Sequence, residues 1–284
     1  MRGDGNSADV RQLLSQRADA LSTLLEGDRT KSELTEELDV SRSTVDRAVR
    51  ELESNGLVRR EGGTVTATLS GRLAYDSYRR FCAETEHVVE FGDLLAELPP
   101  TATIGHEMLD GATAYRSEPP ATGRPANEIT ALIAEGTRLR ACATAVNDSA
   151  AAEQFYRMVT ERGGEGAVVY ASSLADHLRE EYFRTHHEMA ATGRFRAYEI
   201  DSLPYELFLI DTDEGVTAVV LVYNDAGTIH GAIFNDTDAA VEWAEERFES
   251  LVEAAIEFTN DFHLGGVEAD QAGEADADGG TNAE

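Results

Sequence analysis

The stretch from Thr30 to Leu69, TKSELTEELDVSRSTVDRAVRELESNGLVRREGGTVTATL, decides the fold of the first part of the chain. Thr30 and Glu33 have the spacing of a capping box, which starts a short helix. Ser41 is a second helix N-cap, and Gly62-Gly63 suits the loop of a tight hairpin. Two helices followed by a hairpin are the plan of a winged helix-turn-helix, and we predict this fold for the segment.

The second helix of this segment is predicted to have one apolar and one basic face. Its apolar residues recur at helical spacing and form the buried side; they are Val45, Ala48, Val49 and Leu52. The opposite side collects hydroxyl and guanidinium groups, which can donate hydrogen bonds to base edges and phosphates in a major groove. The alternative is an ordinary helical domain with solvated arginines. The N-capped second helix, the glycine hairpin and the opposed faces together favour double-stranded DNA as the partner.

Residues of this helix and of the wing form the predicted DNA interface. Arg47 and Arg50 are expected to read bases, while Arg42 and Ser43 hold phosphates near the start of the helix. The wing is expected to contact the DNA backbone through two arginines at its base. The complete predicted set is Ser41, Arg42, Ser43, Thr44, Arg47, Arg50, Arg59, Arg60 and Thr64.

The acidic charge of the chain lies outside this segment. The formal net charge is −30, but residues 1–80 carry 13 basic against 14 acidic residues, which leaves 11 against 40 for residues 81–284. Lys31 is the one lysine, and this excess of carboxylates over lysine resembles cytoplasmic proteins of extreme halophiles. At molar salt the Debye length is about 3 Å, so repulsion from DNA would be screened. With 42% hydrophobic residues in patterned segments, the chain can bury a core, which excludes an acidic disordered protein.

Composition and patterning divide the chain into six parts. A helical pattern from Leu73 to Leu98 carries an apolar stripe, which we expect to pack within its own subunit or against a second copy. Pro99-Pro100 ends this helix. The predicted parts are a disordered N-terminus (1–9), the winged helix-turn-helix (10–72), a linker or dimerisation helix (73–98), a connector (99–127), a regulatory domain (128–264) and a disordered acidic tail (265–284).

Helices and strands alternate after residue 128, which predicts an α/β domain whose sheet is covered by helices. Short turns at 213–215 and 225–227 permit only hairpins, so we expect a mixed sheet with an antiparallel end. A helix is predicted at 174–192, and a last helix at 237–258 is expected to bury an apolar face that includes Phe258. The fold class of the whole chain is therefore predicted as α+β.

Two stretches near the C-terminus, LPYELFLIDTD and VVLVYNDAGTIHGAIFNDTDAAVEWAEERFESLVEAA, carry a family resemblance. These stretches follow a predicted winged helix and a long helix. In this order the segments resemble the archaeal winged-helix regulators with a methanogenesis/filament-regulator middle domain, which are common in haloarchaea. The resemblance covers nearly the whole chain. It implies transcription regulation and a phospholipase-D-like fold without catalytic duty, and it supplies no ligand.

The sequence shows no complete catalytic or metal-binding motif, and we predict no enzyme, no cofactor and no metal. A phospholipase D active site needs H-x-K-x4-D, but His230 is followed by Ala232 and Thr237 at the lysine and aspartate positions. His106-Glu107 and His187-Glu188 begin like a zinc-protease helix, yet the second histidine is missing from both. Gly163–Gly166 precedes a strand and is explained by a plain turn.

Polar residues follow several predicted strands, where ligands bind in open α/β sheets. Asp148, Ser172, Ser173 and Tyr205 form the predicted effector-binding set. Helix capping is the alternative role for Asp148 and Ser173 taken singly.

We conclude from the sequence that the chain is a sequence-specific transcriptional regulator whose C-terminal domain senses an unknown effector or mediates dimerisation. The expected partners are double-stranded DNA, a second copy of the chain and a small molecule. The absence of a long apolar run or an apolar signal-peptide core predicts a cytoplasmic protein without a membrane partner. The alternatives are a hydrolase-like enzyme with an accessory DNA module and a non-specific architectural DNA protein, which the near-neutral charge of residues 1–80 disfavours.

Overall fold

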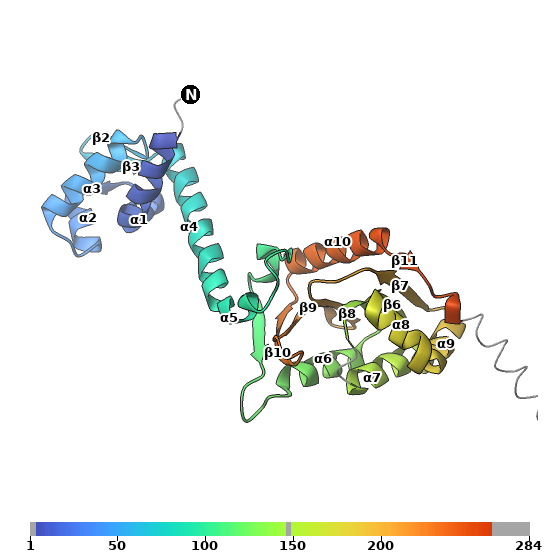
Figure 1. The fold of residues 1–284 in the computed structure, drawn as a ribbon. Coiled ribbons are helices and arrows are strands. Elements are labelled where there is room, and N and C mark those ends of the chain that lie inside the picture. Colours follow the sequence, from blue (N-terminus) through green and yellow to red (C-terminus); the bar gives the residue numbers. More distant parts are fainter. Residues whose placement is uncertain (1–3, 146–148, 263–284) are drawn as a thin grey trace, which may run out of the picture. The chain divides into compact units, whose positions relative to one another are not determined.

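The computed structural model describes residues 4–145 and 149–262. Contacts divide the chain into two compact units, Met1–Glu86 (unit 1) and His87–Glu284 (unit 2). The helix α4 (Leu69–Glu90) begins in unit 1 and ends in unit 2 (Figure 1). The predicted acidic tail, 265–284, lies outside the described residues.

Unit 1 has the predicted winged helix-turn-helix fold. Its strands form a three-stranded antiparallel sheet in the order β1-β3-β2. The elements are α1 (Asp4–Glu26), β1 (Arg29–Thr30), α2 (Lys31–Glu37), α3 (Arg42–Ser54), β2 (Val58–Glu61), β3 (Thr64–Ala67) and the first part of α4. Their apolar side chains form one core, in which Leu21, Leu34, Val49 and Leu52 are fully buried.

Hydrogen bonds fix the start of α2, as the sequence predicts, and also the end of α3. Thr30 accepts a hydrogen bond from the backbone N–H of Glu33, whose carboxylate accepts from the N–H of Thr30, so the capping box is complete. At the end of α3, Gly56 has a φ of 72° and donates to the carbonyl of Glu53, while Leu57 donates to that of Leu52. This is a Schellman motif, which turns the chain into β2.

Unit 1 begins earlier in the chain than we predicted. Residues 4–9 belong to α1 and not to a disordered N-terminus, which corrects the boundary at residue 10. Farther along α1, Leu13, Leu14 and Leu24 enter the core of unit 1. The helix therefore forms because its apolar face packs against α3 and β3.

Unit 2 is an eight-stranded mixed sheet with helices on both faces. The strand order is β11-β7-β6-β5-β8-β9-β10-β4. The strands β5, β6 and β7 are parallel to one another and the other pairings are antiparallel, as predicted for a mixed sheet. The strands are β4 (Thr113–Arg116), β5 (Arg138–Ala143), β6 (Glu165–Ala171), β7 (Phe195–Ile200), β8 (Glu206–Thr212), β9 (Gly215–Tyr223), β10 (Ile229–Asn235) and β11 (Ile256–Glu257).

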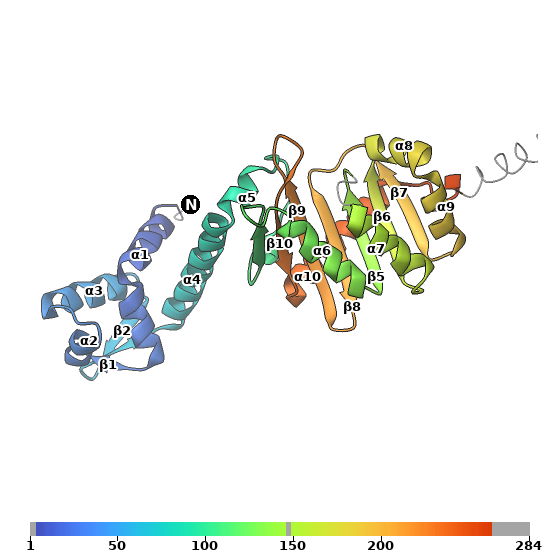
Figure 2. The same ribbon diagram turned by 90° about the horizontal axis from the view of Figure 1, so that it is seen from below.

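The helices cover the two faces of this sheet unequally (Figures 1 and 2). On one face, α6 (Arg124–Glu135), α7 (Ser149–Thr160), α8 (Ser172–Glu181) and α9 (Phe183–Ala191) enclose the α6–α9 core. On the other face, α5 (Gly92–Ala96), the short 3-10 helix η1 (His106–Met108) and α10 (Asp238–Ala254) enclose the α10 core. Apolar residues of the inner strands therefore alternate between two separate cores.

Three elements of unit 2 differ from the prediction. The expected connector, 99–127, contributes β4, which pairs with β10 at the edge of the sheet. The predicted helix at 174–192 is divided into α8 and α9 at Tyr182. The last helix ends at Ala254, and Phe258 packs in the α6–α9 core instead of continuing the apolar face of α10, because β11 carries the chain past the edge of the sheet.

The predicted linker helix is also divided, into α4 and α5. Its apolar stripe is not fully covered, since Phe81 and Val89 are 60% and 75% exposed. Tyr78 packs against the core of unit 1 and Leu95 against the α10 core. No helix in the described ranges has the length and hydropathy of a membrane span.

Candidate nucleic-acid interface

The helix α3 has the two faces that its sequence predicts. Val45, Ala48, Val49 and Leu52 are buried in the core of unit 1. The arginines Arg42, Arg47 and Arg50 are exposed on the other side of the same helix. The apolar face thereby fixes which way the basic face points, which is away from the core.

The exposed arginines of α3 lie on the same helix as Asp46, whose carboxylate already pairs with Lys31. Asp46 accepts a hydrogen bond from the ammonium of Lys31, and this contact lowers the pKa of Asp46 below its ordinary value. Within the described part of the chain, no ion pair engages Arg42, Arg47 or Arg50. Their guanidinium groups can therefore meet an anion without first breaking an ion pair.

Hydroxyl groups gather at the N-terminus of α3. The Oγ of Ser41 accepts from the backbone N–H of Thr44 at 3.2 Å and lies 2.8 Å from the Oγ of Ser43 and 2.9 Å from the Oγ1 of Thr44. Ser41 thus caps the helix, and Ser41, Ser43 and Thr44 are all exposed. The structure brings all three predicted residues to one helix end, where the helix dipole favours an anion.

The wing is a tight hairpin, in which Gly62 and Gly63 have φ values of 59° and 94°. Both values lie in the left-handed region, as a type I′ turn requires. The exposed Arg59 and Arg60 pair with Glu61 and Glu53 at 3.2 Å each. Surface ion pairs contribute about 0–1 kcal/mol, so either arginine can exchange its carboxylate for a phosphate. The hydroxyl of Thr64, the last predicted contact, donates to the carbonyl of Glu61 at 2.8 Å.

The predicted effector residues do not form one site. Asp148 lies outside the described residues. The Oγ of Ser172 donates to the carbonyl of Ile200 at 3.3 Å, and Ser173 is exposed. Ala171 is the N-cap of α8 and makes no side-chain cap hydrogen bond, so Ser173 does not occupy the capping position either. These two serines remain at the C-terminal end of β6, where the sequence placed them.

Tyr205 is separated from these serines, because it belongs to the α10 core on the other face of the sheet from α8. It is 6% exposed, and its hydroxyl donates to the carbonyl of Thr103 at 2.7 Å. Burial raises the pKa of this hydroxyl. The expected convergence of Tyr205 with Ser172 and Ser173 is therefore not seen.

Sequence reasoning missed Glu206, which is 2% exposed. Its Oε1 accepts from the backbone N–H groups of Thr144 and Ala145 at 2.8 and 3.0 Å and from the Oγ1 of Thr144 at 2.9 Å. Its Oε2 accepts from the hydroxyl of Tyr223 at 2.9 Å. The available signal was a carboxylate that begins the apolar strand β8, since a charge in such a strand requires a polar partner.

The incomplete catalytic motifs have structural roles. Thr237, at the aspartate position of the incomplete phospholipase D motif, is the N-cap of α10 and accepts from the N–H of Ala240. His187 lies 2.5 Å from the carbonyl of Phe262 through its Nδ1 and stacks on Phe183. Among the described residues, no group of three or more His, Cys, Asp or Glu side chains could hold a metal ion.

Two families of known proteins match the two units. Residues 7–89 match the HVO_A0261 N-terminal domain, and residues 122–254 match the middle domain of the methanogenesis regulatory protein FilR1. These two matches support an archaeal transcriptional regulator with a FilR1-type middle domain. The resemblance carried by the C-terminal sequence is confirmed over residues 122–254.

Three solved structures that resemble the chain do so only distantly. TrmBL2, an archaeal chromatin protein, is 14% identical over 87% of this chain and 97% of its own, with a TM-score of 0.39. Nuc, a phospholipase D family member from Salmonella typhimurium, is 10% identical over 52% of this chain and 97% of its own, with a TM-score of 0.39. An O-methyltransferase family protein from Burkholderia thailandensis is 14% identical over 68% and 60%, with a TM-score of 0.22. These scores are too low to add to the assignment, and no curated protein matches the chain.

Proposed function

We propose that this regulator reads a specific DNA sequence with α3, acts as a homodimer, and uses unit 2 to sense a small molecule. The observation that carries the proposal is the exposed face of α3, where Arg42, Arg47 and Arg50 have no ion-pair partner among the described residues. A buried apolar face holds these arginines on a rigid helix, as sequence readout in a major groove requires. Arg47 and Arg50 would contact bases, and Arg59 and Arg60 the backbone.

The proposed dimer is supported by the uncovered apolar residues of α4. Leu73, Phe81 and Val89 are 58%, 60% and 75% exposed, although large apolar side chains on a helix favour burial. Winged-helix proteins that read two half-sites gain affinity from a second copy. A dimer would cover apolar surface that one copy leaves in water.

We also propose that unit 2 performs no catalysis and that the protein works in the cytoplasm. The support is that Ala232 and Thr237 replace the lysine and aspartate of a phospholipase D motif, and that Thr237 serves as a helix cap. A ligand of unit 2 would act through the winged helix by binding the DNA-competent and DNA-incompetent states unequally. The helix α4, which is common to both units, is the proposed path of this coupling.

Genome-wide occupancy of the tagged full chain in its source organism tests the proposed function. We expect discrete sites that share one sequence and lie upstream of genes whose transcription changes when the gene for the regulator is deleted. Even coverage of the genome would instead support the non-specific architectural reading. Discrete sites without any transcriptional change would contradict a regulatory role.

A further inference from the structure

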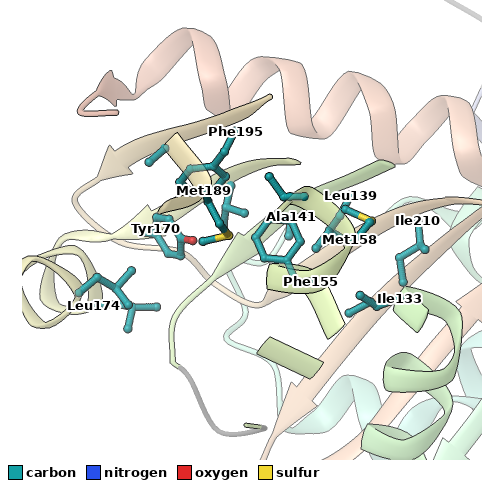
Figure 3. Close-up of a cluster of buried hydrophobic side chains, with 14 of the residues drawn as sticks. Ile133, Leu139, Ala141, Phe155, Met158, Tyr170, Leu174, Met189, Phe195 and Ile210 are labelled. Atoms are coloured by element: carbon teal, nitrogen blue, oxygen red, sulfur yellow. The ribbon is translucent and has the colours of Figure 1, made fainter. Parts of the chain in front are cut away.

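The α6–α9 core contains a cavity of about 120 Å³. Its floor is formed by five neighbouring strands, β6, β5, β8, β9 and β10, and its roof by α6 and α7. Ile133, Leu139, Ala141, Phe155 and Tyr170 are among the lining residues, and Figure 3 shows these side chains gathered between the sheet and the helices. Ala152, in the first turn of α7, also lines the cavity and is exposed, so the cavity opens to solvent there.

The cavity exists because alanines occupy positions where the sheet and helices could carry larger side chains. Ala141 on the central strand β5 stands between its partners Val168 on β6 and Phe208 on β8. Ala143, two residues on, stands opposite Tyr170. Further alanines line the helices and the loop after β5; they are Ala126, Ala145, Ala151 and Ala152. Protein cores are normally packed to the density of organic crystals, so such a void needs an explanation.

Among the described residues that line this cavity, Glu206 carries the one charged side chain. Its Oε1 holds three hydrogen bonds, whereas its Oε2 receives one, from Tyr223. A carboxylate offers about four acceptor positions, two on each oxygen, so Oε2 can accept a further donor. Within the described ranges no basic side chain forms an ion pair with Glu206.

Arg140, another buried charged side chain of unit 2, differs from Glu206 because it has ion-pair partners. Arg140 is 7% exposed and pairs with Asp211 at 3.2 Å and Glu245 at 2.7 Å. Burial raises the pKa of Glu206, although its hydrogen bonds to Thr144 and Tyr223 act in the opposite direction. An unpaired buried carboxylate is costly, and a cation supplied from outside would remove that cost.

We infer that this cavity is a binding site for a small amphipathic amine, whose ammonium group donates to Glu206 and whose apolar group fills the space between Ala141, Phe155 and Tyr170. This inference rests on the proposed sensing role of unit 2 and names the chemical class of its ligand. A cavity of about 150 Å³ lined by apolar side chains holds a benzene molecule, so the apolar group is of about that size. The site replaces the dispersed set of Ser172, Ser173 and Tyr205 as the place of effector binding.

Calorimetry and thermal melting of the full chain, with three matched probes, test the site. Benzylamine carries an ammonium, toluene is its neutral analogue, and benzoate places a carboxylate on the same ring. We expect one saturable site for benzylamine that raises the melting temperature, at least tenfold weaker binding of toluene, and no binding of benzoate.

Two substitutions test the charge of Glu206 and the volume of the cavity separately. Glu206→Gln keeps the size of the side chain and is expected to reduce benzylamine affinity at least tenfold while leaving toluene affinity unchanged. Ala141→Leu fills the cavity and is expected to weaken both probes at least tenfold. Ala167→Leu, on the other face of the same sheet, is the matched control that leaves binding unchanged. If Ala141→Leu does not fold, Ala143→Leu repeats the test on the same strand.

The outcomes distinguish this inference from the proposed function. Equal affinity for benzylamine and toluene, benzylamine binding that Ala141→Leu does not change, or no binding at all would overturn the site while leaving sequence-specific DNA binding intact. Conversely, Glu206-dependent benzylamine binding by a chain that shows no discrete genomic sites would uphold the pocket and overturn the proposed function.

Discussion

Unit 1 keeps three arginines of α3 on its surface without a described ion-pair partner, whereas unit 2 encloses the carboxylate of Glu206 in an apolar cavity without a described basic partner. The first arrangement suits a large polyanion, which meets a rigid exposed helix. The second suits a small cation, which must enter the protein. One chain can therefore present unpaired charge for two partners of opposite sign, because its surface and its interior select ligands of different size.

The largest expected effect tests whether the two units have separate cores. Leu52 is fully buried in unit 1. The substitution Leu52→Ala should therefore destabilise unit 1 by about 2–5 kcal/mol. Unit 2 should unfold at the same denaturant concentration as in the wild type. Chemical denaturation followed by probes in each unit measures both transitions. The control is Leu69→Ala, since Leu69 is 71% exposed. A shift of both transitions together would show that the cores are not independent.

A second difference between the units is their dependence on salt. Residues 81–284 carry 11 basic against 40 acidic residues, whereas residues 1–80 are nearly neutral. Like charges on the larger part repel one another unless salt screens them, since the Debye length falls from about 10 Å at 0.1 M to about 3 Å at 1 M. The melting temperature of unit 2 should therefore rise with potassium chloride more steeply than that of unit 1. Equal slopes for the two units would refute the halophilic interpretation.

The wing should contribute affinity without sequence preference. Replacing both Arg59 and Arg60 by alanine should weaken binding to all DNA sequences alike, because backbone contacts carry no direct base information. The slope of log affinity against log salt should fall by about 2 for the two lost phosphate contacts. Titrations of operator and random DNA at several salt concentrations measure both quantities. A changed preferred sequence with an unchanged salt slope would make the wing a base reader.

The smallest expected effect concerns the pH dependence of unit 2. Because burial raises the pKa of Glu206 in the folded state, the folded protein holds this proton more tightly than the unfolded chain does. The charged form therefore costs stability, and that cost appears as pH rises through the folded pKa. The melting temperature of Glu206→Gln minus that of the wild type should increase from acidic to neutral pH.

Among the described residues, the buried groups Cys142 and Tyr170 do not obscure this measurement. Tyr170 and Tyr223 line the same cavity, and Cys142 interacts with Glu206 electrostatically. Burial raises the pKa of Cys142 to about 12 and that of Tyr170 as well, so neither titrates between acidic and neutral pH. A difference in melting temperature that falls with pH would mean that the hydrogen bonds of Glu206 outweigh its burial.

The sequence predicted the parts of the fold that local patterns determine. Thr30, Ser41 and Gly62-Gly63 carry capping and turn signals that act within a few residues, and each is confirmed. The strand β4 was not predicted, because four residues with weak alternation become a strand only by pairing with β10. The end of α10 was misplaced because Phe258 continues the helical apolar spacing, while its packing partners lie across the sheet edge.

The two candidate sites also differ in whether local sequence patterns determine them. The DNA-binding face could be predicted because Arg42, Arg47 and Arg50 share one helix, so their spacing fixes their common direction. The amine site could not, since Ala141, Glu206 and Tyr223 come from three strands that only the sheet brings together. The sequence also did not show which face of the sheet Tyr205 occupies, because a one-residue shift in a strand exchanges the two cores.

Operator affinity of the Arg47→Ala protein tests the central claim, sequence readout by α3, most directly. The comparison uses the full chain, an operator selected from random DNA, and Arg80→Ala as a control that removes an exposed arginine from α4 instead. A lost base contact costs about 1–3 kcal/mol. Arg47→Ala should therefore weaken operator binding and relax the preference at one position, while Arg80→Ala binds as the wild type does. Unchanged affinity and preference in Arg47→Ala would contradict the assignment of α3 as the recognition helix.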